Sequence, residues 1–169
     1  ADPDLAAFGR KFGIQIVTNA KKVYPMKAAG QRLMGKPAPA DAVKDYAKFF
    51  LGEMSRYPDA ALRKLGLDRI IFATNVFSGS MRRGGFAEWD TDSIHLDIVE
   101  GKGNLEYRRG LIHHELFHVM DMRDDGNTAP DPEWASLNGE NYRYAPPKEW
   151  STSLSEEFRK SLPPVKWNP

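Results

Sequence analysis

The length, composition and charge of the chain limit the classes of protein to which it can belong. Its 169 residues, 41% hydrophobic and 28% charged, are enough for a globular core, and we predict a single domain over residues 1–169. The formal net charge of +1 provides no field that would attract nucleic acid or a membrane surface. No apolar run is long enough to span a bilayer. Because the chain has no cysteine, a zinc site would have to use His, Asp or Glu.

The first residue gives a weak indication of localisation. The chain begins at Ala1 rather than at methionine, which fits either removal of an export signal or an arbitrary chain boundary. Of the two we favour export, and we therefore expect a secreted or periplasmic protein.

The first third of the chain predicts a strand, a connection and a helix. Residues 12–18 are rich in β-branched side chains and bounded by turn-forming residues, which is typical of a strand. Residues 20–40 show no steady period and predict a surface connection with room for one short helix. From Asp41, a suitable N-cap, apolar residues recur at three- and four-residue steps up to the break at Pro58, and predict an amphipathic helix.

The middle of the chain predicts three strands. Residues 69–76 form an apolar run typical of a buried strand, and residues 86–89 and 93–98 predict two short strands around the turn at 90–92. Alternation within 93–98 assigns His95 to the polar face, so we interpret it as a structural residue rather than a metal ligand. Arg82 and Arg83 could receive an acidic group of a substrate, but we interpret both as solvated turn residues.

The next predicted element is a helix that carries a metal-binding spacing. Asn104 can cap a helix over residues 105–120, and apolar side chains cover much of its surface. Such a helix is expected to be buried, so that His114 and His118 would lie at the floor of a cleft. These two histidines and Glu115 form the HExxH spacing.

The HExxH spacing fits a hydrolytic zinc site. Residues four apart lie on one face of a helix, so His114 and His118 can both bind one metal ion. Glu115 can then act as general base on a metal-activated water. His113 is expected to pack or form hydrogen bonds, and Asp121 to orient one of the imidazoles.

A third metal ligand is needed, and three glutamates are candidates. Glu133 lies in the first turn of a short predicted helix, where capping already explains it. Glu156 can form a capping box with Ser153 at the start of the last predicted helix. Glu157 lies at the border of the buried face of that helix, and we predict it as the third ligand.

The motif and the segments after it resemble a known family. These segments are His113-His114-Glu115-Leu116-Phe117-His118-Val119-Met120-Asp121, then Asp131-Pro132-Glu133-Trp134-Ala135-Ser136-Leu137-Asn138, then Tyr142-Arg143-Tyr144. Together they resemble a family of zinc-binding metallopeptidases from bacteria and fungi. The HExxHxxD pattern is also similar to the lethal factor-like clan of gluzincins. The resemblance covers roughly residues 69–145.

The resemblance implies an α+β, zincin-like fold, in which a small mixed sheet packs on the HExxH helix. It also implies an edge strand that aligns an extended peptide, a downstream glutamate as third ligand, and a tyrosine, here Tyr144 or Tyr142, that stabilises the oxyanion. Members of the family continue into a further acidic helix, whereas this chain stops at Pro169. Either Glu156 or Glu157 takes the place of that ligand, or the sequence is cut short of it.

The sequence therefore predicts a zinc-dependent endopeptidase. We expect the strand over residues 93–98 to pair with extended substrate through backbone hydrogen bonds. Two alternatives use the same residues: a catalytically incompetent, zinc-stabilised module that binds peptides, and a zinc amidase that acts on a non-protein amide. No basic cluster indicates nucleic-acid binding.

Overall fold

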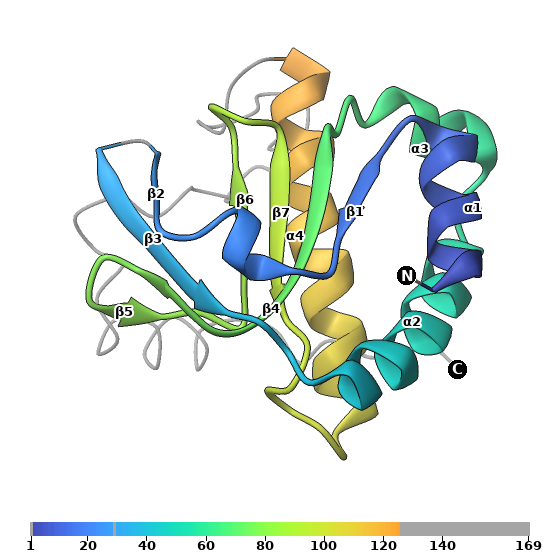
Figure 1. Ribbon diagram of the computed structural model, residues 1–169. Helices are drawn as coiled ribbons and strands as arrows, with labels where there is room; N and C mark the ends of the chain where they lie inside the picture. The colour runs from blue at the N-terminus through green and yellow to red at the C-terminus, as the bar shows by residue number, and fades with distance from the viewer. Residues whose placement is uncertain (1, 29, 126–169) are drawn as a thin grey trace, which may run out of the picture. The chain divides into compact units, whose positions relative to one another are not determined.

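One long strand, β4 (Arg69–Ser78), organises the sheet of this protein. The computed structural model describes residues 2–28 and 30–125, and the described residues belong to one unit that spans Ala1–Asn127 (Figure 1). In chain order the other elements are α1 (Pro3–Phe12), β1 (Gln15–Val17), the 3-10 helix η1 (Ala20–Lys22), β2 (Met26–Ala28), β3 (Gln31–Lys36), α2 (Ala40–Met54), α3 (Asp59–Lys64), β5 (Met81–Arg82), β6 (Gly85–Glu88), β7 (Ser93–Asp97) and α4 (Leu105–Asp125). The single domain predicted over residues 1–169 extends beyond the described residues and stays a prediction.

The sheet is mixed, which confirms the predicted α+β class. Its strand order is β2-β3-β4-β7-β6, and β1 and β5 also pair with β4. The first half of β4 pairs in parallel with β1 and β7, and the second half pairs antiparallel with β3 and β5. β6 pairs antiparallel with β7, with Glu88 opposite Ser93. The predicted hairpin around residues 90–92 is therefore confirmed.

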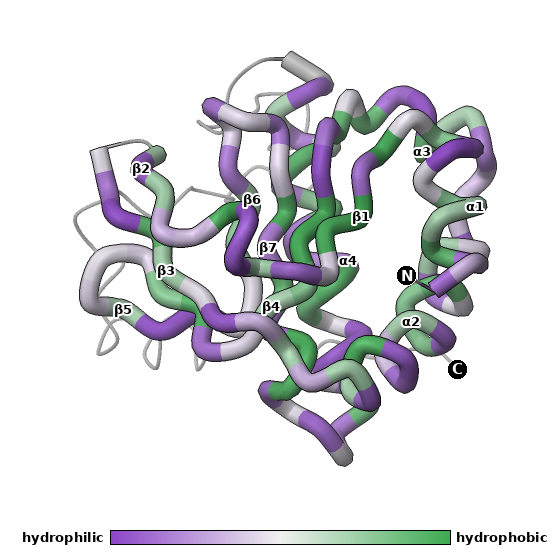
Figure 2. Tube along the Cα trace, in the orientation of Figure 1, coloured by the Kyte–Doolittle hydropathy of each residue, from purple (hydrophilic) through white to green (hydrophobic). Residues whose placement is uncertain are grey.

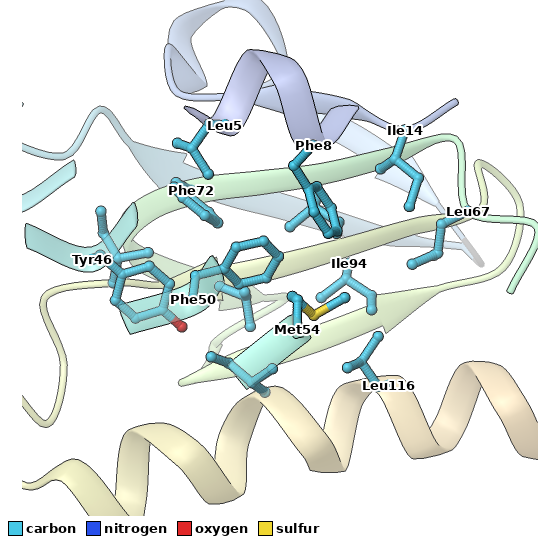
Figure 3. Close-up of a cluster of buried hydrophobic side chains, with 14 of the residues drawn as sticks. Leu5, Phe8, Ile14, Tyr46, Phe50, Met54, Leu67, Phe72, Ile94 and Leu116 are labelled. Atoms are coloured by element: carbon cyan, nitrogen blue, oxygen red, sulfur yellow. The ribbon is translucent and has the colours of Figure 1, made fainter. Parts of the chain in front are cut away.

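The helices cover one face of the sheet. Figure 3 shows side chains from α1, α2 and α4 meeting those of the strands in one apolar cluster, which includes Phe8, Phe50, Phe72, Ile94 and Leu116. The hydropathy of the trace is high along β1 and β4, which lie between the helices and the outer strands (Figure 2). Among the described residues, no helix is both long enough and apolar enough to cross a membrane.

The opposite face of the sheet is also covered. A second cluster there joins Ile71, Ala73 and Val76 of β4 to residues of η1, β2 and β3 such as Ala20, Ala28 and Leu33. The two strands of this cover, β2 and β3, were not predicted, because residues 20–40 have no steady hydrophobic period. The prediction of a surface connection is wrong for the residues that form these strands. Cross-strand pairing of Met26 with Leu33 and burial of Leu33 (2% exposed) show why this hairpin forms.

Other boundaries differ from the predicted ones. Phe12 ends α1 rather than beginning a strand, because Gly13 terminates the helix with φ of 70°. The N-cap of α2 is Pro39, and Asp41 lies in the first turn, where its charge still favours the helix N-terminus. The predicted helices from 41 and from 105 are confirmed as α2 and α4, although α4 continues to Asp125.

Buried polar groups on β7 belong to the covered second face. His95 is 1% exposed, and its Nδ1 lies 2.5 Å from the Tyr24 hydroxyl. Asp97 accepts backbone hydrogen bonds from Asn75 (2.8 Å), Val99 (3.2 Å) and Glu100 (3.0 Å). The predicted alternation along β7 is confirmed and His95 is structural, but its face is buried rather than solvated.

Burial of His95 makes the stability of the fold depend on pH. Burial, with a smaller effect of Arg69, lowers the pKa of His95 from 6.5 to about 4. Unfolded chains take up this proton below pH 6.5 and folded chains do not, so stability falls as the pH decreases through this window. We expect a loss of roughly 3 kcal/mol in unfolding free energy between pH 6.5 and 4, relative to His95→Gln. Denaturant unfolding of both proteins across this range measures it, and parallel curves would contradict the prediction.

Candidate metal centre

The helix that carries the motif, α4, packs against the sheet through its apolar side. Asn104 caps α4, since its Oδ1 accepts a hydrogen bond of 3.0 Å from the backbone of Tyr107, as predicted. Ile112, Leu116 and Val119 are spaced by four and three residues and are 1%, 1% and 4% exposed. α4 packs against β6, as Figure 1 shows. This packing fixes which residues of the motif face the sheet and which face away from it.

The two predicted histidine ligands lie against each other on α4. The Nε2 atoms of His114 and His118 lie 3.0 Å apart, and the rings are steeply inclined, with centroids 4.4 Å apart. Two imidazole nitrogens that bind one tetrahedral zinc ion at its usual distances are separated by about 3.3 Å. At 3.0 Å the two atoms are within hydrogen-bond distance of each other, and their separation is also close to the one that a shared zinc ion requires.

The surroundings of this pair differ from the predicted cleft. Within the described residues His114 is exposed and His118 is half-buried, because α4 buries one side rather than most of its surface. Burial and the neighbouring His114 lower the pKa of His118, although Asp121 acts in the opposite direction. A lowered pKa favours the neutral imidazole, which is the form that binds metal. The orienting role predicted for Asp121 fits its charge acting on His118 and stays a prediction.

The other predicted site residues lie outside the part of the chain that the structure describes. They are Glu133, Tyr142, Tyr144, Glu156 and Glu157. Among residues 2–28 and 30–125, no group of three His, Asp or Glu side chains is arranged to hold a metal ion. The choice among the glutamates as third ligand therefore stays a prediction.

Glu115 points into the contact between α4 and β6. It is 4% exposed, and its carboxylate accepts a hydrogen bond from the backbone of Ala87. Burial raises the pKa of Glu115 to about 7, against the lowering effects of the Ala87 hydrogen bond and of the charge on Arg83. The carboxyl group thus sits beside the outer strand of the sheet, one residue from His114.

Two glycines allow this close approach of strand and helix. A Cβ atom on Gly85 would lie 2.8 Å from both Cγ and Oε1 of Glu115, and one on Gly84 would lie 2.3 Å from the hydroxyl of Tyr107. Adjacent glycines at the start of a strand are a signal of close backbone approach. This signal was present in the sequence, although the contact itself was not predicted.

The predicted hydrogen-bonding role of His113 is confirmed. Its Nδ1 lies 2.5 Å from the hydroxyl of Tyr57, and its Nε2 lies 3.1 Å from Oε2 of Glu53. Glu53, on α2, has a side chain only 5% exposed and also binds Arg56 (2.8 Å) and Arg109 (3.0 Å). Burial raises the pKa of Glu53, but the hydrogen bonds with His113 and Arg109 and the charges of Arg109 and Arg56 outweigh it, so the net pKa is lowered. Sequence reasoning missed this network, although Glu53 lies three residues after Phe50 on the buried face of α2.

Removal of the Glu53 carboxylate should loosen the attachment of α4 to α2. Glu53→Ala leaves two arginines and a histidine without their shared acceptor, and we expect a loss of about 2 kcal/mol, because both arginines are partly exposed and water screens the effect. Asp45→Ala, at an exposed position of the same helix, should change stability by less than about 0.5 kcal/mol. Chemical denaturation of the two variants checks this, and equal stabilities would show that the network contributes nothing.

The expected edge strand is assigned differently by the structure. β7 lies between β4 and β6 and uses both of its edges, so the prediction that residues 93–98 pair with a substrate is wrong. Within the described residues, β6 is the outermost strand on this side of the sheet.

Comparison with known proteins identifies no relative of this chain. No protein-family model, no curated protein and no solved structure matches it.

Proposed function

We propose that this protein is a zinc-dependent endopeptidase with a zincin-like fold of the lethal factor-like gluzincin type. The observation that carries the proposal is the position of the Nε2 atoms of His114 and His118, which lie 3.0 Å apart on α4. Glu115, the residue after His114, has a buried carboxyl group. Two neighbouring imidazoles and a carboxylate next to them in the sequence supply two of the three ligands and the general base that a hydrolytic zinc site requires.

The proposal assigns a role to each residue of the motif. His114 and His118 hold the zinc ion, and a downstream glutamate, Glu157 in preference to Glu156 or Glu133, completes the set. Zinc in such a site activates water and polarises a carbonyl oxygen. Glu115 takes a proton from the attacking water and delivers it to the leaving amine. Tyr144 or Tyr142 donates a hydrogen bond to the oxyanion.

An extended peptide is the substrate that suits the sheet. β6 is the outer strand on the side of α4, and its residues Gly85 and Ala87 contact Glu115. A peptide that adds to β6 through backbone hydrogen bonds would bring its scissile bond close to the motif. β6 therefore takes the role first predicted for residues 93–98.

Peptide cleavage by the zinc-loaded protein tests this function. The protein is incubated with a mixed peptide library, and products are identified by mass spectrometry with zinc present, after chelation, and after zinc is restored. We expect cleavage that is lost with the chelator and regained with zinc. Tight binding of one zinc ion without any cleavage would favour the zinc-stabilised peptide-binding module instead.

A further inference from the structure

Two neighbouring arginines before β6 have different surroundings. Arg82 makes ion pairs with Asp97 (3.6 Å) and Glu100 (3.7 Å), and the Asp97 side chain is completely buried. The backbone N–H of Arg83 donates to the carbonyl of Val76 (2.9 Å), but its side chain is exposed and makes no ion pair within the described residues. The guanidinium of Arg82 is thus already used by the fold, and that of Arg83 is available.

The backbone that follows Arg83 lies directly on the motif helix. Gly84 approaches Tyr107 so closely that a Cβ atom would lie 2.3 Å from its hydroxyl, and Gly85 approaches Glu115 in the same way at 2.8 Å. A side chain at either position would force Tyr107 or Glu115 to move, so this segment lies close against α4. Arg83 therefore lies beside the candidate site, separated only by Gly84 from the start of the strand proposed to bind peptide.

The guanidinium of Arg83 is an exposed charge that no ion pair within the described residues neutralises. Glu115 itself is buried and accepts its hydrogen bond from Ala87. An exposed guanidinium beside a peptide-binding strand has five donors suited to a carboxylate.

We propose that Arg83 is a specificity-determining residue that binds the carboxylate of an acidic substrate residue next to the scissile bond. This inference rests on the proposed endopeptidase function and names its preferred substrates, peptides with Asp or Glu near the cleaved bond. Arginine pairs with carboxylates through two parallel hydrogen bonds, which gives both attraction and geometric selectivity. A basic substrate residue at the same position would be repelled.

Matched peptides test this preference. Cleavage sites found in the mixed library are rebuilt as pairs that differ in one residue next to the scissile bond, glutamate in one peptide and glutamine in the other. We expect kcat/KM of the wild-type protein to favour glutamate by about 10-fold at one flanking position, with the ratio falling as salt increases. Arg83→Gln should bring the ratio close to one, and Arg83→Glu should shift the preference to lysine.

Arg82→Gln is the matched control, because it removes an adjacent arginine of the same exposed segment. It should weaken the fold through Asp97 and leave the glutamate-to-glutamine ratio unchanged. An unchanged ratio in Arg83→Gln, or a wild-type protein that cleaves both peptides equally, would overturn the inference and leave the endopeptidase function standing. If the wild-type protein cleaves no peptide, the proposed function fails and this inference fails with it.

Discussion

Replacement of Glu115 by glutamine is expected to reduce peptide hydrolysis by about 10²- to 10⁴-fold, the usual contribution of a general base. Glutamine has the shape of glutamate and its amide oxygen can still accept the hydrogen bond from Ala87, but it cannot accept the proton of the attacking water. Steady-state rates on a peptide from the library measure the effect. Zinc content should stay at the wild-type value, because Glu115 is not among the proposed ligands.

Glu106→Gln is the control for this change, since it is the same substitution at an exposed position of α4. It should cleave peptide at the wild-type rate. Full activity of Glu115→Gln with zinc bound would rule out Glu115 as the base, and equal losses in both variants would point to a general effect on the helix.

Truncation of Leu116 is expected to cause a large loss of stability. Leu116 is 1% exposed and joins the apolar cluster that α1, α2 and the sheet form, as Figure 3 shows. Leu116→Ala removes buried methyl groups and leaves a cavity, at a cost of about 3 kcal/mol. Because Leu116 follows Glu115 directly, the same change should also weaken the packing of the HExxH residues against the sheet. Activity should therefore decrease together with stability.

Leu105→Ala is the matched control, because Leu105 begins the same helix and is 58% exposed. Its unfolding free energy should change by less than about 0.5 kcal/mol. Denaturant unfolding of both variants decides the question. If the two leucine variants were equally stable, the burial of α4 described above would be incorrect.

Local patterns were sufficient to predict the elements with strong periodicity. Three predictions that depend only on neighbouring residues are confirmed: the apolar run of β4, the alternation of β7 and the Asn104 cap of α4. The role of His113 could also be predicted, since its position, about 100° from His114 on a helix, turns it toward other partners. Helix α1 is missing from the predicted elements, although Asp2 and Pro3 carry the signals of a helix start.

What could not be predicted depends on contacts between distant segments. The outermost strand on this side is β6 rather than β7, and nothing in residues 93–98 themselves shows which strand covers their second edge. The burial of Glu115 follows from its contact with Gly85, thirty residues earlier in the chain. The availability of Arg83 likewise depends on Asp97 and Glu100 pairing with Arg82 instead. The third ligand stays a prediction, since all three candidate glutamates lie outside the described residues.

Zinc titration of four proteins tests the central claim, that His114 and His118 hold a zinc ion, most directly. Calorimetry and metal analysis are applied to the wild type, His114→Ala, His118→Ala and His113→Ala, the last being a neighbouring histidine whose nitrogens are used by Tyr57 and Glu53. We predict one zinc ion per wild-type chain. Loss of His114 or His118 should weaken zinc binding by more than about 100-fold, the upper range for residues that only orient a ligand. His113→Ala should still bind one zinc ion, and its affinity should differ from that of the wild type by less than about 100-fold. Absence of zinc binding by the wild type, or unchanged affinity without His114 or His118, would contradict the account.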